Sequence, residues 1–238
     1  MAADSVSSST PGRSRVLAVV TLASLIIMVT MGTRLTVGLF VQPLMDSKGL
    51  GIAAVSMALA IGQLSWGIFQ PIFGVWADKG HAFAALATGM LCIAAGQILT
   101  ITADGFWPLT LAQGILSPGG VAAGSFAALF GIAVSRLPSR THSVAGGVIN
   151  AGGSVGQFVY APMIHLIIHL RDYCASLFVL AGLAIAAIVP SWALCRIKPL
   201  REMDEGKPDT SDSLARKGLR EQLCVALRTP SYILLHAG

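Results

Sequence analysis

Apolar residues run along this chain in long stretches, and charged residues lie almost entirely in the short segments between them. A membrane-spanning α-helix needs about 20 predominantly apolar residues, and six stretches reach that length. These stretches are Val16–Leu44, Ile52–Trp76, Ala82–Thr102, Phe106–Val134, Ser143–His169 and Ala175–Leu194. Because the connecting segments are short, we expect neighbouring helices to be antiparallel. The pattern therefore predicts an all-α, polytopic membrane protein with a six-transmembrane-helix bundle over 15–196.

The composition agrees with lipid as the solvent. Of the 238 residues, 54% are hydrophobic and 11% are charged, whereas a soluble domain carries about 25% charged residues. The 26 glycines are typical of closely packed membrane helices. The four cysteines are scattered without metal or redox spacing, and no phosphate-binding loop or nucleophile elbow occurs. We therefore expect no disulfide, no metal, no cofactor and no enzymatic activity.

The distribution of Lys and Arg predicts the topology. Of these 16 residues, 13 precede the first helix, follow the sixth or lie in the loops after the second and fourth. Only Lys48 and Arg171 lie in the opposite loops. Cytoplasmic loops carry an excess of basic residues, so we expect a cytoplasmic N-terminus in a multi-pass protein of the cell membrane, of the bacterial inner-membrane kind. Because the net charge of +5 follows this topology, we expect no nucleic-acid partner.

The ends of the chain differ from the bundle. Residues 1–14 predict a cytoplasmic disordered tail. Residues 197–225 are rich in both signs of charge and predict a cytoplasmic linker. Residues 226–238 resemble the start of a seventh helix that is too short to cross the membrane. We therefore expect one six-helix half, a linker and a truncated beginning of the next half.

The loop between the second and third helices reads GVWADKGHAF, residues 74–83. Its Gly74, Asp78 and Lys79 match the signature Gly-x-x-x-Asp-Arg/Lys of Major Facilitator Superfamily transporters, whereas Gly80 comes one position early and no Lys or Arg follows. With six helices and a charged linker, the chain resembles the N-terminal half of such a transporter over about residues 15–235.

Four further segments are similar to the monocarboxylate and oxalate/formate antiporter-like branch of that superfamily. They are TRLTVGLFVQP (33–43), WGIFQPIFG (66–74), LSPGGVAAGSF (116–126) and INAGGSVGQF (149–158). The resemblance implies secondary active transport of a small organic anion, such as a monocarboxylate or dicarboxylate, by symport or antiport with alternating access. Its partners would be that anion, the lipid bilayer, and either a missing C-terminal half or a second copy of the chain. A truncated product that does not transport, or a six-helix scaffold or regulatory protein, is the alternative.

Gly74, Asp78 and Lys79 are predicted to form a conformational gate. A glycine near a helix end permits close approach of a neighbouring helix. The Asp78 carboxylate can accept hydrogen bonds at a facing helix N-terminus and pair with a cation there. Such a contact can form in one conformation and break in another, and the resemblance favours this role over a solvated loop carboxylate.

Polar and small residues share one face in four of the predicted helices. These faces comprise Thr30, Arg34, Gly38 and Gln42; Gln63, Gly67, Gln70 and Gly74; Gln113, Ser117, Gly120 and Gly124; and Asn150, Ser154, Gln157 and Ala161. The resemblance implies that helices one and four line a central cavity, two and five flank it, and three and six face lipid. We predict that Gln63, Gln113, Asn150 and Gln157 bind substrate; hydrogen bonding between helices is the alternative. The glycine pairs 67/74, 120/124 and 152/156 predict tight helix packing.

Arg34 lies inside the first apolar stretch, and placing a charged side chain there costs at least about 2.5–3.5 kcal/mol on insertion scales. It is about 28 Å along a helix from Arg15, in the outer half of the membrane. No Asp or Glu lies in the interior of any predicted helix. An arginine that reaches the headgroups is one interpretation. The other is that Arg34 binds the carboxylate of an organic acid in a water-filled cavity, since a guanidinium grips a carboxylate at two points.

Overall fold

A computed structural model of the chain describes residues 11–199. The expected linker, the start of a seventh helix and residues 1–10 of the expected tail lie outside that range. The helices are α1 (Pro11–Thr36), α2 (Val41–Lys48), α3 (Ile52–Trp76), α4 (Ala82–Thr102), α5 (Phe106–Leu109), α6 (Ser117–Ala123), α7 (Phe126–Val134), α8 (His142–Leu170), α9 (Tyr173–Ala186) and α10 (Ile188–Arg196). Between residues 11 and 199 there is no β-strand, so the predicted all-α class is confirmed.

In the described part, five continuous helical stretches are long and apolar enough to cross a membrane. The second, Ile52–Thr102, contains 51 residues, about twice what one crossing needs. It bends at Gly80, where φ is 88°, a left-handed conformation that glycine adopts without strain. This bend separates α3 from α4 at the predicted boundary. The first helix begins at Pro11, inside the expected tail, because proline is well suited to the first turn of a helix.

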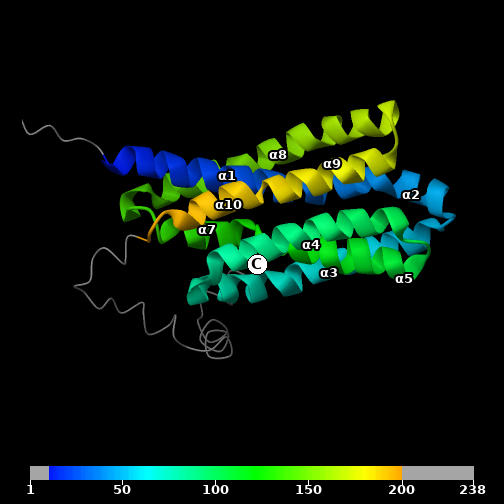
Figure 1. Cartoon of the computed structure of the whole chain (residues 1–238), viewed down its shortest axis with the longest axis horizontal. Coiled ribbons are helices and arrows are strands. Elements are labelled where there is room, and N and C mark those ends of the chain that lie inside the picture. The colour runs from blue at the N-terminus through cyan, green and yellow to red at the C-terminus, as the bar shows by residue number, and fades with distance from the viewer. Residues whose placement is uncertain (1–10, 200–238) are drawn as a thin grey trace, which may run out of the picture. The chain divides into compact units, whose positions relative to one another are not determined.

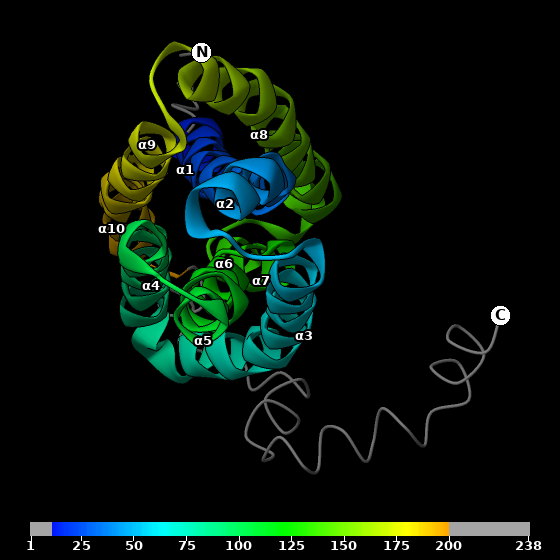
Figure 2. The same ribbon diagram turned by 90° about the vertical axis from the view of Figure 1, so that its right-hand side faces the viewer.

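The helices lie roughly along a common axis (Figure 1). Seen along it, α3 and α8 lie on one side, with α1, α2 and α7 between them, whereas α4, α9 and α10 lie on the opposite side (Figure 2). The closest pairings join α1 with α8, α4 with α6, and α4 with α9. The third helix, α4, and the sixth, α9 and α10, thus share one flank of the bundle, and their facing lipid stays a prediction.

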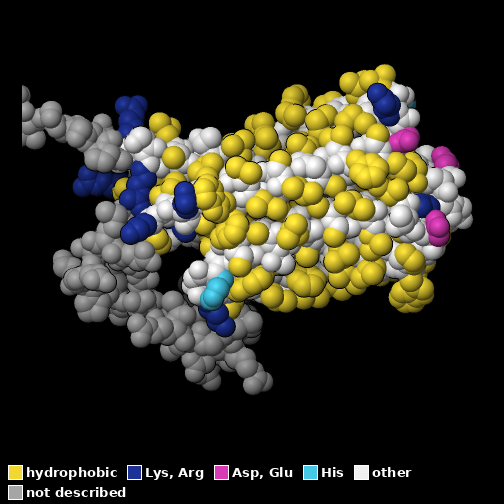
Figure 3. Space-filling model, viewed as in Figure 1, with side chains coloured by type: hydrophobic (Ala, Val, Ile, Leu, Met, Phe, Trp, Pro, Cys, Tyr) yellow, Lys and Arg dark blue, Asp and Glu magenta, His cyan; other side chains and the backbone are white. Residues whose placement is uncertain are grey.

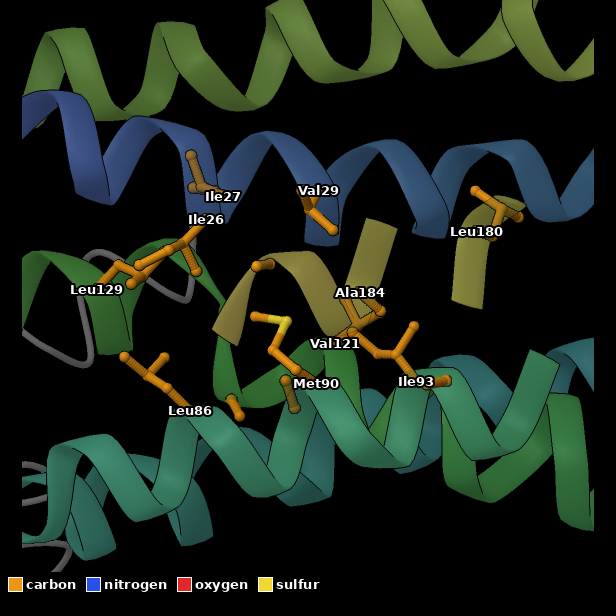
Figure 4. Close-up of a cluster of buried hydrophobic side chains, with 14 of the residues drawn as sticks. Ile26, Ile27, Val29, Leu86, Met90, Ile93, Val121, Leu129, Leu180 and Ala184 are labelled. Atoms are coloured by element: carbon orange, nitrogen blue, oxygen red, sulfur yellow. The ribbon is translucent and has the colours of Figure 1, made fainter. Parts of the chain in front are cut away.

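A continuous apolar core fills the interior of the bundle. Large side chains such as Ile26, Met90 and Leu129 are fully buried and come from α1, α4 and α7. Figure 4 shows Ile26 beside Leu129, and Val121 of α6 beside Ala184 of α9. Since lipid tails are as apolar as these side chains, close packing rather than exclusion of water holds the helices together.

Glycines provide that close packing on the fourth and fifth helices. A methyl group added at Gly152 would lie 2.8 Å from the Cβ atom of Ser24 on α1, and one at Gly156 would collide with the Met28 carbonyl oxygen. Likewise, Gly120 packs on Gly89 of α4. The predicted packing role is therefore confirmed for these two helices. It is not seen for Gly67 and Gly74 of α3, where an added methyl group would meet no atom within 4 Å.

The two ends of the described bundle differ in charge (Figure 3). Basic side chains gather at the end where α1 begins and α10 finishes, and acidic ones at the other end. At the acidic end, the Lys48 ammonium pairs with Asp104 at 3.1 Å and joins the end of α2 to the end of α4. At the basic end, Arg136 donates to the Ile197 carbonyl and joins the ends of α7 and α10.

Candidate functional site

Arg34 of α1 lies against two residues of α3. Its Nη2 donates a 2.7 Å hydrogen bond to the Oε1 atom of Gln63, and its Cζ lies 4.0 Å from the centre of the Trp66 ring. Gln63 and Trp66 are three residues apart, so they share one face of α3. An amide oxygen and an aromatic face both stabilise a guanidinium while contributing no negative charge. The positive charge of Arg34 is therefore not neutralised by these two neighbours.

Arg34 forms no salt bridge with any residue between 11 and 199. Its side chain is half-buried, and its Nε has no hydrogen-bond acceptor within the described part of the chain. A buried donor without an acceptor costs free energy of about 1–3 kcal/mol, more for a charged group. An anion that supplied two oxygens to this guanidinium would remove that cost.

The residues of the polar face predicted for the first helix differ in burial on the two sides of Arg34. Thr30, one turn before Arg34, is fully buried and donates to the Gly124 carbonyl at 2.9 Å. Beyond Arg34, α1 ends at Thr36, and the following residues form a short 3₁₀ turn, Val37–Phe40. Gln42 of α2 is exposed and donates to Asp46. Arg34 is the only charged member of this predicted stripe, and its side chain is half-buried.

Asn150 and Gln157 lie on α8, across α1 from the Gln63 helix (Figure 2). Asn150 is exposed and Gln157 is half-buried. Neither is hydrogen-bonded to another described side chain, so their amides are free for contacts from outside the bundle. The structure brings Gln63 to Arg34 but does not bring these two residues to it.

Gln113 lies elsewhere, in a buried polar cluster between α4 and the fourth helix. It belongs to the π-helical turn η3 (Thr110–Leu116), and its Nε2 donates to Thr100 at 2.8 Å and to Gln97 at 3.2 Å. Gln97 in turn donates to Ser117 at 3.0 Å. All four side chains are buried. These contacts fit the alternative interpretation, hydrogen bonding between helices, while the Gln113 Oε1 has no partner among the described residues, and the substrate-binding role of Gln113 stays a prediction.

The predicted gate residues lie at the bend between α3 and α4. Asp78 and Lys79 are exposed at the basic end of the bundle, and Asp78 forms no salt bridge with a described residue. Gly74 has open space beside it. An open flank at Gly74 leaves room for a helix to approach, and the gating role stays a prediction.

Sequence reasoning missed two parts of this arrangement. Trp66 could have been found from its spacing, because it lies three residues after Gln63 on the same helical face as the predicted site. Gln97 and Thr100 have the same spacing on the third helix, which we expected to face lipid. Polar pairs of this kind indicate a contact, although the sequence does not say which helix supplies the partner.

The long apolar helices, the close packing of small residues and the arginine enclosed among them define a multi-pass α-helical membrane protein. A model of the Major Facilitator Superfamily matches residues 22–236. The chain belongs to this superfamily and is a membrane transporter of the major facilitator type. A search of curated proteins found no match.

Proposed function

We propose that this chain forms the N-terminal half of a secondary active transporter for a small organic anion, a monocarboxylate or a dicarboxylate. Arg34 is the residue that holds the carboxylate. Gln63 and Trp66 orient the guanidinium from α3, and Asn150 and Gln157 on α8 offer amide groups to the same substrate once the two halves close around it. Exchange or symport needs no protonatable group in the described helices when the substrate itself carries the charge.

The observation that supports this function is the surroundings of the Arg34 guanidinium. It is half-buried in a membrane helix, is held only by neutral groups, and has a donor without an acceptor. An arginine that served only to anchor a helix end would turn to the headgroups, where its charge is solvated. Here the side chain turns to another helix of the bundle instead.

Two further proposals concern the placement of this bundle. The basic end faces the cytoplasm, since basic residues are enriched in cytoplasmic loops. The bundle works against a second one, because alternating access rocks two repeats around a shared site at the bilayer midplane. Asp78 and Lys79 then lie at the cytoplasmic entrance, where a neighbouring helix N-terminus can bind the carboxylate in one conformation.

Ligand binding by the purified chain tests the role of Arg34. The protein in lipid nanodiscs is titrated with acetate, lactate and succinate, and with acetamide as an uncharged match for acetate. Its melting temperature is measured at each concentration, because a ligand that binds only the folded state raises it. We expect carboxylates to stabilise the protein and acetamide to have no effect. Arg34→Ala should lower carboxylate affinity about tenfold or more, because a hydrogen bond to a charged group contributes about 1.5–3 kcal/mol.

Arg171→Ala is the matched control, because it removes an exposed arginine at the end of α8 and should leave the affinity unchanged. Transport is tested in a carrier that contains both bundles, where Arg34→Ala should abolish uptake of the acid that binds. Carboxylate binding and uptake that persist at wild-type strength in Arg34→Ala would exclude this role.

A further inference from the structure

The fourth transmembrane helix is interrupted where it meets Thr30 of α1, one helical turn before Arg34. Helix α6 ends at Ala123, Gly124 leaves helical geometry with φ −98° and ψ 24°, and Ser125 is extended with ψ 159° before α7 begins at Phe126. The whole span Phe106–Val134 is long and apolar enough to cross the membrane, so this break lies within it. Non-helical backbone at membrane depth is tolerated only where protein covers it or where it lines a water-filled cavity.

The break exposes the N-terminus of α7. The first amides of a helix have no acceptor within that helix, and they carry the positive end of the helix dipole. Ser125 occupies the capping position, yet its side chain forms no capping hydrogen bond. Phe126 and Ala127, the first two residues of α7, are exposed on the surface of the described bundle. The first turn of α7 therefore lies at the surface of the described bundle.

Ser125 carries a second unpaired polar group at this break, its hydroxyl. Its side chain is only 3% exposed, and its Oγ has no hydrogen-bond partner in the part of the chain that the structure describes. Thr33 of α1, next to Arg34 in the chain, is fully buried and its Oγ1 is also without a partner among residues 11–199. Buried hydroxyl groups are usually hydrogen-bonded, so the unpaired Ser125 hydroxyl at the α7 N-terminus indicates an acceptor that binds there.

Arg34 and the α7 N-terminus belong to one region of the fold. Thr30 donates to the carbonyl of Gly124, the residue before Ser125, and this contact fixes α1 against the break. Arg34 lies four residues further on the same face of α1, a rise of about 6 Å. Helix α7 also packs against α1 through Leu129 and Ile26 (Figure 4).

We propose that the N-terminus of α7, with the Ser125 hydroxyl, is a second carboxylate-binding group, and that the site it forms with Arg34 takes a short dicarboxylate such as succinate. One carboxylate binds the Arg34 guanidinium. The other accepts hydrogen bonds from the first amides of α7 and from Ser125. This inference rests on the proposed function, because it assumes that Arg34 binds the first carboxylate.

The test compares succinate with succinamate, in which a neutral amide of the same shape replaces one carboxylate. Both are titrated into the purified chain in nanodiscs, and affinities are taken from the shift in melting temperature. A second carboxylate at a partly buried helix N-terminus should give succinate an advantage of about tenfold. Equal affinities of the wild-type protein for the two compounds would overturn the proposal without any substitution.

A matched pair of substitutions then locates the second group. Ser125→Asp and Ser125→Asn both introduce good capping residues of the same size, but only Asp brings a fixed negative charge to the α7 N-terminus. We expect the advantage of succinate to disappear in Ser125→Asp and to remain in Ser125→Asn. The pair Gly51→Asp and Gly51→Asn at the start of α3 controls for added charge and should not differ.

The two proposals fail in distinguishable ways. If Ser125→Asp keeps the full advantage of succinate, the α7 site is excluded, while binding of acetate that depends on Arg34 leaves the proposed function intact. If Ser125→Asp does not fold, Ser125→Ala replaces it, and removal of the hydroxyl should reduce the advantage by a factor of about three. An unchanged advantage in Ser125→Ala and in a folded Ser125→Asp contradicts the proposal.

Discussion

Two groups of polar side chains lie in the same bundle, and their surroundings give them different roles. Between α4 and the fourth helix, Gln97, Thr100 and Gln113 are buried and donate most of their hydrogen bonds to one another or to nearby carbonyls. On the side of α1 and α3, Arg34 and Gln63 are partly exposed, and Arg34 keeps a donor without an acceptor. The first group uses its donors within the protein and leaves one neutral acceptor, the Gln113 Oε1, without a partner among the described residues. The second leaves a donor of a charged guanidinium unpaired within the same part of the chain.

This difference distinguishes a structural contact from a candidate binding site more sharply than residue type does. Each group contains a glutamine, Gln63 or Gln113, that lies on a polar stripe of its own helix, so the sequence pattern alone does not distinguish them. A buried cluster whose donors are used within the protein gains nothing from a ligand and stabilises helix association by about 1 kcal/mol per contact. An enclosed charge without a counterion lowers the stability of the free protein, and such a cost is typical of functional residues in membranes.

The largest expected effect is on the free energy of unfolding. Replacing one residue of each group by leucine should change it in opposite directions. Arg34→Leu removes an enclosed charge and should raise the stability of the ligand-free protein, by up to about 3 kcal/mol. Gln113→Leu leaves the Gln97 oxygen without its donor and should lower stability by about 0.6 kcal/mol, at most about 1.7. Thermal melting in detergent micelles measures both changes.

Carboxylate affinity, measured for the same two leucine variants, is the control for this comparison of stabilities. Arg34→Leu should lose carboxylate binding, whereas Gln113→Leu should bind as the wild type does. A Gln113 variant with normal stability and weakened binding would place Gln113 in the site after all, and would show that the comparison of the two groups is wrong.

Much of the fold could be predicted from the sequence. The helices α3 and α4 begin and end at the residues that the apolar stretches indicate, because the thickness of the hydrocarbon region sets the length of a span and charges mark its ends. Arg34 could be singled out for the same reason. A charge inside an apolar stretch is visible without knowledge of the partner helix.

The assignment of individual polar residues could not be made in the same way. Gln63 and Gln113 each lie on a stripe of small and polar residues, and both patterns fit a cavity. Whether such a glutamine joins a buried cluster or a partly exposed contact depends on the rotation of each helix about its axis, and packing partners set that rotation. The break in the helix before Ser125 could not be predicted from the sequence either, because the apolar stretch Phe106–Val134 continues through it.

A smaller effect is expected for Gln63, which positions the Arg34 guanidinium. Gln63→Leu removes the 2.7 Å hydrogen bond, so the guanidinium samples more orientations and carboxylate affinity should fall by a factor of about three to ten. Gln70→Leu, about two turns further along α3, makes the same chemical change at a residue without a hydrogen bond to another described side chain. It should leave the affinity unaltered. Equal losses in the two variants would indicate a general disturbance of α3 rather than a role for Gln63.

The smallest effect should come from Trp66, because a cation–π contact at a partly exposed position contributes only about 0.5–1 kcal/mol. Trp66→Phe keeps an aromatic face and should weaken succinate binding about twofold, whereas Trp66→Leu removes the face and should weaken it about fivefold. Trp192 is the control, since the Arg196 guanidinium lies 4.1 Å from its ring centre in a similar pair on α10. Trp192→Leu should leave the affinity unchanged. If Trp66→Leu also binds normally, the indole only covers the side chain of Arg34, and Gln63 alone orients the charge.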